Sequence, residues 1–561
     1  MSRRDTLLSA LACLVFGVWL AATVPSSPAL GWDESMHAEL PAARVALALR
    51  AGELGTAAHS LLGCAQYPPA WPAVLGLAQV PAGVSELLAR GLTSLAWAVG
   101  LFFAFAVTHR AARASGRVDP RTAPWAALAL GMLCPLAASF SGTLFLEVPS
   151  ALATGFALWA WMRRADGPRA QRELVAGIAV AVALFTKWNY GLLLGAALAI
   201  DWVFELVAAR KAGRSREFLL RARWLVAAPL AACLWWFVLP LPGGLDLARE
   251  HRAAFAGFLA GNLGATPATA AERILFAATG IGATVRLTVL VVVLAFAALR
   301  SARVPAVRVL VLAAGLLLGA PLVHPFFLDR FLIPGLVPLF ALAGLGLALL
   351  LPREGPARTA TIGILALASL LAPGRDGGWL ADALERLPAE DPARGYVLGV
   401  LEDRVRLGPG RRLPTGGLER VEHDALLDLV AREVRAGERV GWIGMSSEIS
   451  PAALHLGLLA RGGGPAWFLD AHPPRLDVAY FGVDPTLDES ELRAYAGRFD
   501  VILWTDPIDL RERRERAFVA GYRDWLLAIQ ASDVRELGRV AIARPLRAPL
   551  EVRLYACRRV P

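Results

Sequence analysis

The chain has 561 residues, of which 56% are hydrophobic and only 19% are charged. This composition is too apolar for an ordinary soluble protein, and it excludes a disordered chain. The net charge of +10 does not indicate a nucleic-acid partner, because most arginines of the first 360 residues bracket apolar runs, as topogenic signals do. Five dispersed cysteines exclude a disulfide scaffold and a CxxC metal site. We predict a polytopic helical membrane protein.

The first 30 residues combine Arg3 and Arg4 with an apolar core at residues 6–24. This pattern fits either a cleaved signal peptide or a retained first helix. We favour the retained helix, because the stretch is close to spanning length and many similar runs follow.

Apolar runs long enough to approach a hydrocarbon core of about 30 Å recur as far as residue 373. We place eleven of them at residues 6–24, 91–109, 122–143, 148–162, 173–186, 190–208, 224–242, 284–299, 307–323, 331–351 and 359–373. Residues 173–208 are divided into two spans.

The distribution of Lys and Arg predicts which side each loop faces. Dense basic clusters lie at residues 110–121, 163–172 and 210–223, whereas the alternate loops hold far fewer basic residues. Because basic residues concentrate in cytoplasmic loops, the N-terminus is predicted to lie inside. An odd number of spans then places everything after residue 373 outside the cytoplasm. We expect the protein to lie in the cell inner (plasma) membrane.

The composition changes at residue 374, which gives domains at 1–373 and 374–561, the first with a long outer loop at 25–90. Beyond that point we expect an extracytoplasmic α/β domain. Its predicted helices cover residues 424–437, 489–497 and 512–531, and its predicted strands cover residues 439–445, 499–506 and 550–559. No phosphate-binding glycine motif follows these strands, so no nucleotide site is predicted there.

Paired carboxylates, Asp33 and Glu34, follow the first span at once. Such a pair at the mouth of a membrane cavity suits a general base and its supporting group or a metal ligand. The alternative is that Asp33 caps an outer helix, with Glu34 in its first turn. Glu39 is expected to lie on the same helix and to be solvated.

A third carboxylate and two cations lie at other outer loop edges. Glu147 stands where the third and fourth spans meet, and it either lines a cavity or caps the next helix. Lys187, between Thr186 and Trp188, either snorkels or holds a phosphate. Arg330 precedes the tenth span as a second cation. Cations beside carboxylates favour an anionic lipid substrate.

The outer histidines, His37, His59, His251 and His324, have no paired spacing. We interpret them as hydrogen-bonding or interfacial residues. A divalent metal held with Asp or Glu is left open, and no other cofactor is predicted.

An ordered set of motifs resembles the GT-C membrane glycosyltransferases over residues 1 to about 350, in particular the branch of the protein O-mannosyltransferases and the lipid A aminoarabinose transferase. The motifs are DESMHAELPAARVAL, QYPPAWPAVLG, SELLARGL, FLEVPSALATGFALW, LFTKWNYGLLL and DRFLIPGLVPLFALAGLG.

The resemblance implies roles for these residues. Asp33 corresponds to the catalytic base, with Glu34 supporting it, and Glu147 stands where the lipid A branch has Asp. Lys187 of the T-K element and Arg330 of the R-Y-x-x-P element, in which Phe331 replaces Tyr, would hold the donor phosphate. Other residues expected to line the cavity or contact the acceptor are His37, which replaces a Tyr, and Tyr67, Trp188 and Tyr190.

The implied activity is an inverting glycosyl transfer from a polyprenyl-phosphate sugar to a hydroxyl of a glycan, lipid or protein on the outer side of the membrane. A phosphate leaving group needs cations to neutralise developing charge, and a hydroxyl nucleophile needs a base. Two other classes fit the composition: a secondary transporter, and a membrane sensor or scaffold with an outer ligand-binding domain.

Overall fold

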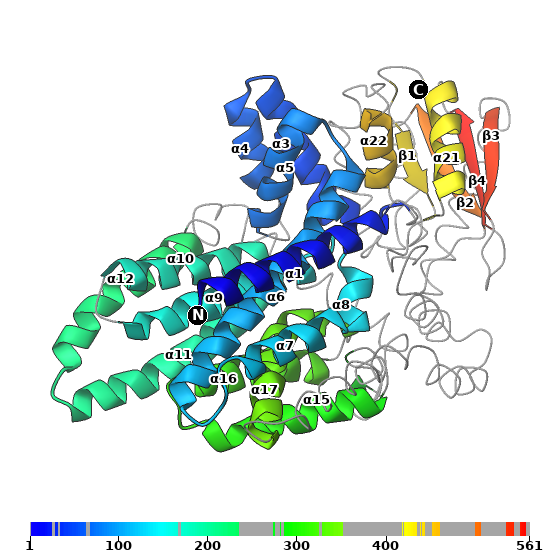
Figure 1. Ribbon diagram of the computed structural model, residues 1–561. Helices are drawn as coiled ribbons and strands as arrows, with labels where there is room; N and C mark the ends of the chain where they lie inside the picture. Colours follow the sequence, from blue (N-terminus) through cyan, green and yellow to red (C-terminus); the bar gives the residue numbers. More distant parts are fainter. Residues whose placement is uncertain are drawn as a thin grey trace.

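The computed structural model describes residues 2–24, 29–31, 34–62, 68–166, 170–234, 273–274, 281, 285–324, 328–351, 418, 420–434, 438, 440–443, 451–460, 500–506, 535–542 and 550–556. The protein is a polytopic helical membrane protein with an α/β unit towards its C-terminus (Figure 1). Within the described ranges, five helices are long and apolar enough to cross a membrane: Arg3–Ala22, Glu86–Ser115, Trp188–Lys211, Pro305–Val323 and Arg330–Leu350.

The helices up to residue 351 fall into a bundle and an outer group. The bundle contains α1 (Arg3–Ala22), α6 (Glu86–Ser115), α7 (Thr122–Met132), α8 (Pro135–Phe140), α9 (Glu147–Arg163), α10 (Ala170–Thr186), α11 (Trp188–Lys211), α12 (Ser215–Cys233), α15 (Val285–Ala298), α16 (Pro305–Val323) and α17 (Ile333–Leu350), with 3₁₀ turns η3 (Arg164–Asp166), η5 (Leu299–Ser301) and η6 (Asp329–Leu332). The outer group contains the π-helical turn η2 (Ser35–Glu39) and helices α3 (Leu40–Arg50), α4 (Leu54–Leu62) and α5 (Ala70–Ala82).

Each apolar run predicted between residues 6 and 351 overlaps a described helix, and the run at 359–373 lies outside the described residues. The ends of α6 show the local reasons. Its N-cap Ser85 accepts a hydrogen bond from the backbone N–H of Leu88 at 3.3 Å. At the other end Gly116 takes a left-handed conformation, φ +62°, which ends the helix.

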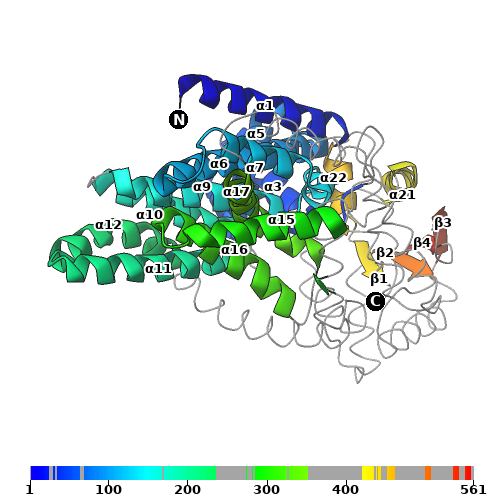
Figure 2. The same ribbon diagram turned by 60° about the horizontal axis from the view of Figure 1, so that its bottom comes forward.

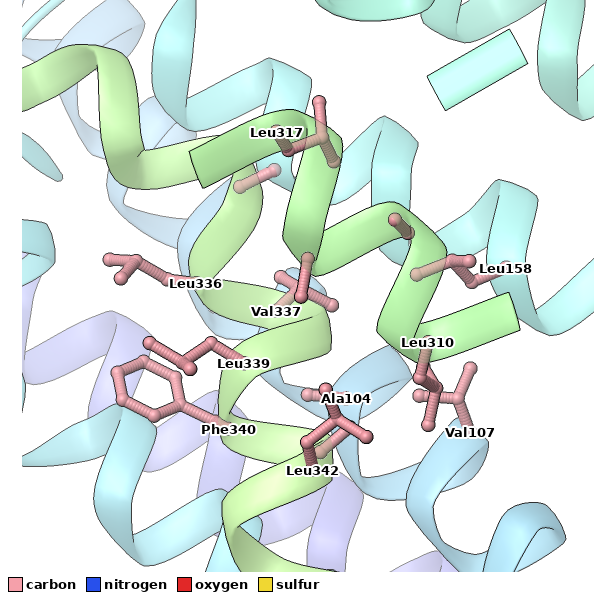
Figure 3. Close-up of a cluster of buried hydrophobic side chains, with 14 of the residues drawn as sticks. Ala104, Val107, Leu158, Leu310, Leu317, Leu336, Val337, Leu339, Phe340 and Leu342 are labelled. Atoms are coloured by element: carbon pink, nitrogen blue, oxygen red, sulfur yellow. The ribbon is translucent and has the colours of Figure 1, made fainter. Parts of the chain in front are cut away.

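The core of the bundle forms around α17, whose side chains are buried from Ile333 to Leu347. Figure 3 shows Val337 and Phe340 of α17 among side chains of α6, α9 and α16. Glycines let backbones approach closely, as at Gly346, where a Cβ would collide with the carbonyl oxygen of Leu294 on α15. A helix that is hydrophobic on all sides in this way lies in the interior of the bundle.

The run predicted at 122–143 is not one helix, and this expectation was wrong. Pro135 begins α8, and Cys134 before it is extended, with φ −74° and ψ 109°. A residue before proline is disfavoured in the helical region, and the proline ring clashes with the preceding turn. The chain therefore breaks between α7 and α8, and a buried segment from Ser141 to Leu146 leads into α9.

Buried charges at the other end of α9 and α11 are paired. Asp201 of α11 accepts hydrogen bonds from Trp161 Nε1 at 2.9 Å and from Arg308 Nε at 2.8 Å. Arg164 bonds Glu173 at 2.6 Å and Glu205 at 2.9 Å. These pairs join α9, α10, α11 and α16 at the end of the bundle opposite the N-terminus of α9.

The C-terminal α/β unit contains α21 (Arg420–Glu433), α22 (Pro451–Ala460) and a four-stranded mixed sheet. The strands β1 (Val440–Ile443), β2 (Val501–Asp506), β3 (Arg535–Ile542) and β4 (Leu550–Ala556) lie in the order β1-β2-β4-β3. Only β1 and β2 are parallel, with Val440 opposite Val501. The helix predicted at 424–437 and the three predicted strands overlap α21, β1, β2 and β4, whereas α22 and β3 were not predicted. The helices predicted at 489–497 and 512–531 lie outside the described residues.

The C-terminal α/β unit lies beside the outer helices rather than apart from them. In Figures 1 and 2, α22 is adjacent to the outer group, and it contacts η2 and α3. Ala453 and Leu456 of α22 share an apolar cluster with Leu30, Ala38 and Leu144. Elements from both ends of the chain thus meet near the residues that follow α1.

Candidate active site

Three charged side chains from distant parts of the chain meet at the N-terminal end of α9. Lys187 Nζ donates a hydrogen bond to Glu147 Oε1 at 2.8 Å, and Arg330 Nε lies 3.6 Å from the same oxygen. The side chain of Glu147 is 1% exposed, that of Lys187 8% and that of Arg330 14%. Two cations therefore share one carboxylate in a setting largely shielded from water.

Lys187 owes its position to a helix break. It separates α10 from α11 in an extended conformation, φ −157° and ψ 111°, so the predicted division of residues 173–208 is correct. Gly191, one turn later, lies against the backbone of Leu184, where a Cβ would be 2.4 Å from the Cα atom. This close approach holds the first turn of α11 beside the last turn of α10.

Aromatic rings also contact the two cations. The guanidinium carbon of Arg330 lies 3.8 Å from the ring centre of Phe145, and Lys187 Nζ lies 5.3 Å from that of Tyr190 and 5.7 Å from that of Phe331. Cation–π contacts of this kind stabilise a partly desolvated charge. Phe331, which replaces the expected Tyr, therefore contributes a ring face at this position.

Glu34 fastens the first outer loop to the segment that precedes Glu147. Its two carboxylate oxygens accept hydrogen bonds from the backbone N–H groups of Gly31, at 3.0 Å, and Leu144, at 2.8 Å. Burial raises the pKa of Glu34, while Arg90 and the two N–H groups oppose that change. Leu144 is three residues before Glu147, so the residues after α1 are tied to the site by a side chain that is completely buried.

Glu39 is not solvated, and the expectation that it would be was wrong. It is 1% exposed, at the end of η2, and Gln79 Nε2 of α5 donates to its Oε1 at 2.9 Å. Burial raises the pKa of Glu39 to about 8, although the hydrogen bond from Gln79 lowers it. The pairing of η2 with α5 buries this face of the outer group.

The remaining predicted residues are placed as follows. Tyr190 is buried beside Lys187, whereas Trp188 is 40% exposed at the start of α11. His37 belongs to η2, and its side chain lies outside what the structure describes. Asp33 and Tyr67 are outside the described residues.

Residues without a role in the sequence analysis also belong to this region. Phe145 stacks on Arg330, and Arg90 of α6 is completely buried between acidic side chains. Arg273 donates to the carbonyl oxygens of Leu322 and His324 at 3.2 and 2.6 Å, at the C-terminal end of α16. Of these contacts, the sequence could have indicated only the pairing of Arg90 with Glu86, because the two residues are one helical turn apart.

The described side chains contain no group of three or more His, Cys, Asp and Glu residues able to hold a metal ion. The chemistry that these residues offer is electrostatic: a buried pair of cations, balanced in part by Glu147, at the junction of four elements. Such a pair of cations suits an anionic group.

Comparison with solved structures identifies the architecture. ArnT from Cupriavidus metallidurans in the apo state superposes with a TM-score of 0.58 over 97% of both chains, at 14% identity. The chain has the ArnT fold. A second ArnT structure, bound to undecaprenyl phosphate, superposes with a TM-score of 0.57 over 98% of both chains, also at 14% identity. No family model matches the sequence, and no curated protein matches it. The ArnT fold thus extends through the C-terminal α/β unit.

Proposed function

We propose that this protein is an inverting glycosyltransferase that moves a sugar from a polyprenyl-phosphate carrier to an acceptor hydroxyl on the outer side of the membrane. The observation that carries the proposal is the meeting of Lys187 and Arg330 at Glu147. It is supported by the ArnT fold, since the lipid A aminoarabinose transferase belongs to the branch that the sequence motifs resemble.

The donor class follows from charge. A sugar joined to a polyprenyl chain through a phosphodiester carries a negative charge, and Lys187 and Arg330 bring two largely buried cations together at Glu147. Hydrogen bonds to a charged group in a water-poor site contribute about 1.5–3 kcal/mol each. The structure of ArnT bound to undecaprenyl phosphate supports a polyprenyl carrier for this chain as well.

The reaction is a single displacement. The acceptor oxygen bonds to the anomeric carbon as the bond from that carbon to the phosphate oxygen breaks, and the electron pair leaves with the polyprenyl phosphate. Lys187 and Arg330 neutralise the charge that grows on the leaving group. Asp33 takes the proton from the acceptor hydroxyl, and attack from the opposite face inverts the anomeric carbon.

Glu34 and Glu147 then act on other groups rather than on the sugar. Glu34, bound to the N–H groups of Gly31 and Leu144, supports the neighbouring Asp33. Glu147 keeps the two cations together when no donor is bound. The residues proposed to line the cavity or contact the acceptor are His37, Tyr67, Trp188 and Tyr190. A divalent metal held by three or more His, Cys, Asp or Glu ligands would have to involve residues beyond those described.

The protein is proposed to lie in the inner membrane with its N-terminus in the cytoplasm and with the α/β domain of residues 374–561 outside. The acceptor is then a glycan, lipid or protein of the cell envelope. Arginine-rich loops on the opposite side of the bundle support this orientation.

The test compares Asp33→Asn with Glu53→Gln, a conservative change of an exposed carboxylate in the same outer loop. Surface glycans, lipids and proteins from cells that carry each variant are weighed by mass spectrometry. We expect D33N to lose one sugar mass from one acceptor class at normal protein abundance, and E53Q to keep it. Unchanged glycans in D33N cells would refute the proposal and favour a transporter or a scaffold.

A further inference from the structure

The C-terminal α/β unit makes a charged contact with the helix that carries Arg90. Both terminal nitrogens of Arg420, at the start of α21, bond the two oxygens of Glu86, at the start of α6, at 2.8 and 3.3 Å. These residues are 334 positions apart in the sequence. A two-point bond between a guanidinium and a carboxylate fixes orientation as well as distance.

Glu86 also contacts Arg90, which in turn contacts the first outer loop. Its Oε1 lies 2.9 Å from Arg90 Nε, and Arg90 reaches Glu34 Oε2 at 3.8 Å. Glu34 in turn binds the N–H of Leu144. A continuous series of charged contacts therefore joins Arg420 to the backbone just before Glu147.

Because Arg90 and Glu34 are buried, their geometry depends on the more exposed residues Glu86 and Arg420. The side chains of Arg90 and Glu34 are 0% exposed, whereas those of Glu86 and Arg420 are 23% and 37% exposed. A fully buried guanidinium is stable only while its carboxylates hold their geometry, because an uncompensated buried charge is strongly unfavourable. Glu86 faces two arginines, so the loss of Arg420 lets Glu86 change its position relative to Arg90.

A second contact lies on the other side of Asp33 in the sequence. The N–H of Ala29 donates to the carbonyl oxygen of Leu418 at 2.8 Å. Leu30 and Ala38 pack with Ala453 and Leu456 of α22. The α/β unit thus contacts the loop both before and after the Asp33–Glu34 pair.

We propose that the C-terminal α/β unit is a working part of the transfer site, in which Arg420 is a positioning residue that acts through Glu86 and Arg90 on Glu34. This inference rests on the proposed function, because the residue that is positioned, Glu34, supports the proposed base Asp33. Through this series of ion pairs, the C-terminal α/β unit is necessary for turnover and not only for the choice of acceptor.

The test uses the full-length protein with three substitutions. Arg420→Gln removes the charge, Arg420→Lys keeps it, and Arg432→Gln is the matched control on the same helix, where the side chain is 65% exposed and pairs only with its neighbour Glu433 among the described residues. Hydrogen exchange of the peptide covering residues 29–40 is measured together with transfer kinetics.

We expect R420Q to exchange faster over residues 29–40 and to lose about tenfold in kcat with an unchanged KM for the donor, since small misplacements of a catalytic group are costly. R420K is expected to keep most of the wild-type exchange protection over residues 29–40 and most of the wild-type kcat. R432Q is expected to match the wild type in both. Equal exchange and equal kcat in R420Q and R432Q would overturn the inference, as would a change in the KM for the donor alone.

The exchange measurement separates this inference from the proposed function. If the wild type transfers no sugar, the glycosyltransferase proposal fails, and unchanged exchange in R420Q would additionally overturn the structural link between the α/β unit and the loop.

Discussion

Replacement of Lys187 by Met is the sharpest perturbation of the buried charges. The substitution keeps an unbranched chain of similar length and removes the ammonium group that bonds Glu147 at 2.8 Å. Glu147, 1% exposed, then has Arg330 at 3.6 Å as its remaining cation in that group of three. The change therefore affects both folding and the proposed donor site.

The two effects have different expected sizes. Removal of one partner of a buried ion pair costs about 3–5 kcal/mol, and Arg330 should limit the loss to the lower end. The lost hydrogen bond to the donor phosphate is worth about 1.5–3 kcal/mol, which corresponds to a fall of about tenfold to 150-fold in kcat/KM.

The double variant Lys187→Met with Glu147→Gln separates the two effects. It leaves no unpaired buried carboxylate, so we expect it to melt closer to the wild type than K187M does. Its net charge at the site is the same as in the wild type, because Arg330 remains. A fall in kcat/KM in this variant therefore reports the missing Lys187 donor rather than altered net charge.

Arg308→Met is the matched control. It breaks the buried pair with Asp201 in the other half of α11, where Arg308 NH2 lies 2.7 Å from the carboxylate. We expect a loss of stability similar to that of K187M, with kcat/KM per folded molecule unchanged. Purified variants in bilayer discs are assayed by thermal unfolding and by transfer of labelled sugar. Wild-type kcat/KM in the double variant would refute the phosphate-binding role of Lys187.

Three further predictions concern the surroundings of the site. Gly191→Ala should cost about 1–3 kcal/mol and reduce transfer, because its Cβ would meet the backbone of Leu184, whereas Gly195→Ala, with nothing within 4 Å, should be neutral in both assays. Glu39→Gln should remove a pH effect: folded Glu39 keeps its proton up to about pH 8, the unfolded chain releases it near 4.5, and stability therefore falls by about 1.4 kcal/mol per pH unit between those values. Unfolding curves from pH 5 to 8 with the same slope in E39Q would contradict this. His455, whose pKa burial lowers to about 4, acts in the opposite direction, because the unfolded chain takes up its proton near 6.5. His455→Gln should therefore gain stability relative to the wild type as the pH falls from 6.5 to 4.5, and equal acid sensitivity would exclude this contribution.

The meeting of Glu147, Lys187 and Arg330 was predictable from the sequence because of membrane topology. Consecutive spans alternate in direction, so charges at every second loop share one side of the membrane. Three such charges at the edges of apolar runs were therefore expected near one another. Their direct contact required the break at Lys187, which the flanking apolar runs indicated.

The burial of Glu39 and Arg90 was not predictable in this way. Glu39 is buried where η2 packs against α5, and its partner Gln79 lies 40 residues later, so nothing local to η2 indicates that burial. Arg90 sits at the edge of an apolar run, where a snorkelling arginine is the ordinary expectation. Its burial depends on Glu34 and on the packing of the C-terminal α/β unit near Glu86.

The fold was predictable where the pattern was strong and not where it was weak. Pro135 offered a local signal for the break between α7 and α8, but the surrounding apolar run concealed it. Strand β3, with the sequence RELGRVAI, alternates poorly and contains Gly538, so its membership of the sheet depends on pairing with β4. Tertiary pairing rather than local preference determined β3, whereas the break at Pro135 has a local cause.

The most direct test of the account is equilibrium binding of undecaprenyl phosphate to the purified full-length protein, with the wild type, the K187M/E147Q double variant and R308M measured side by side. We expect saturable binding by the wild type and R308M, and binding at least about tenfold weaker in the double variant. Equal affinity in all three proteins, or no binding by the wild type, would contradict it.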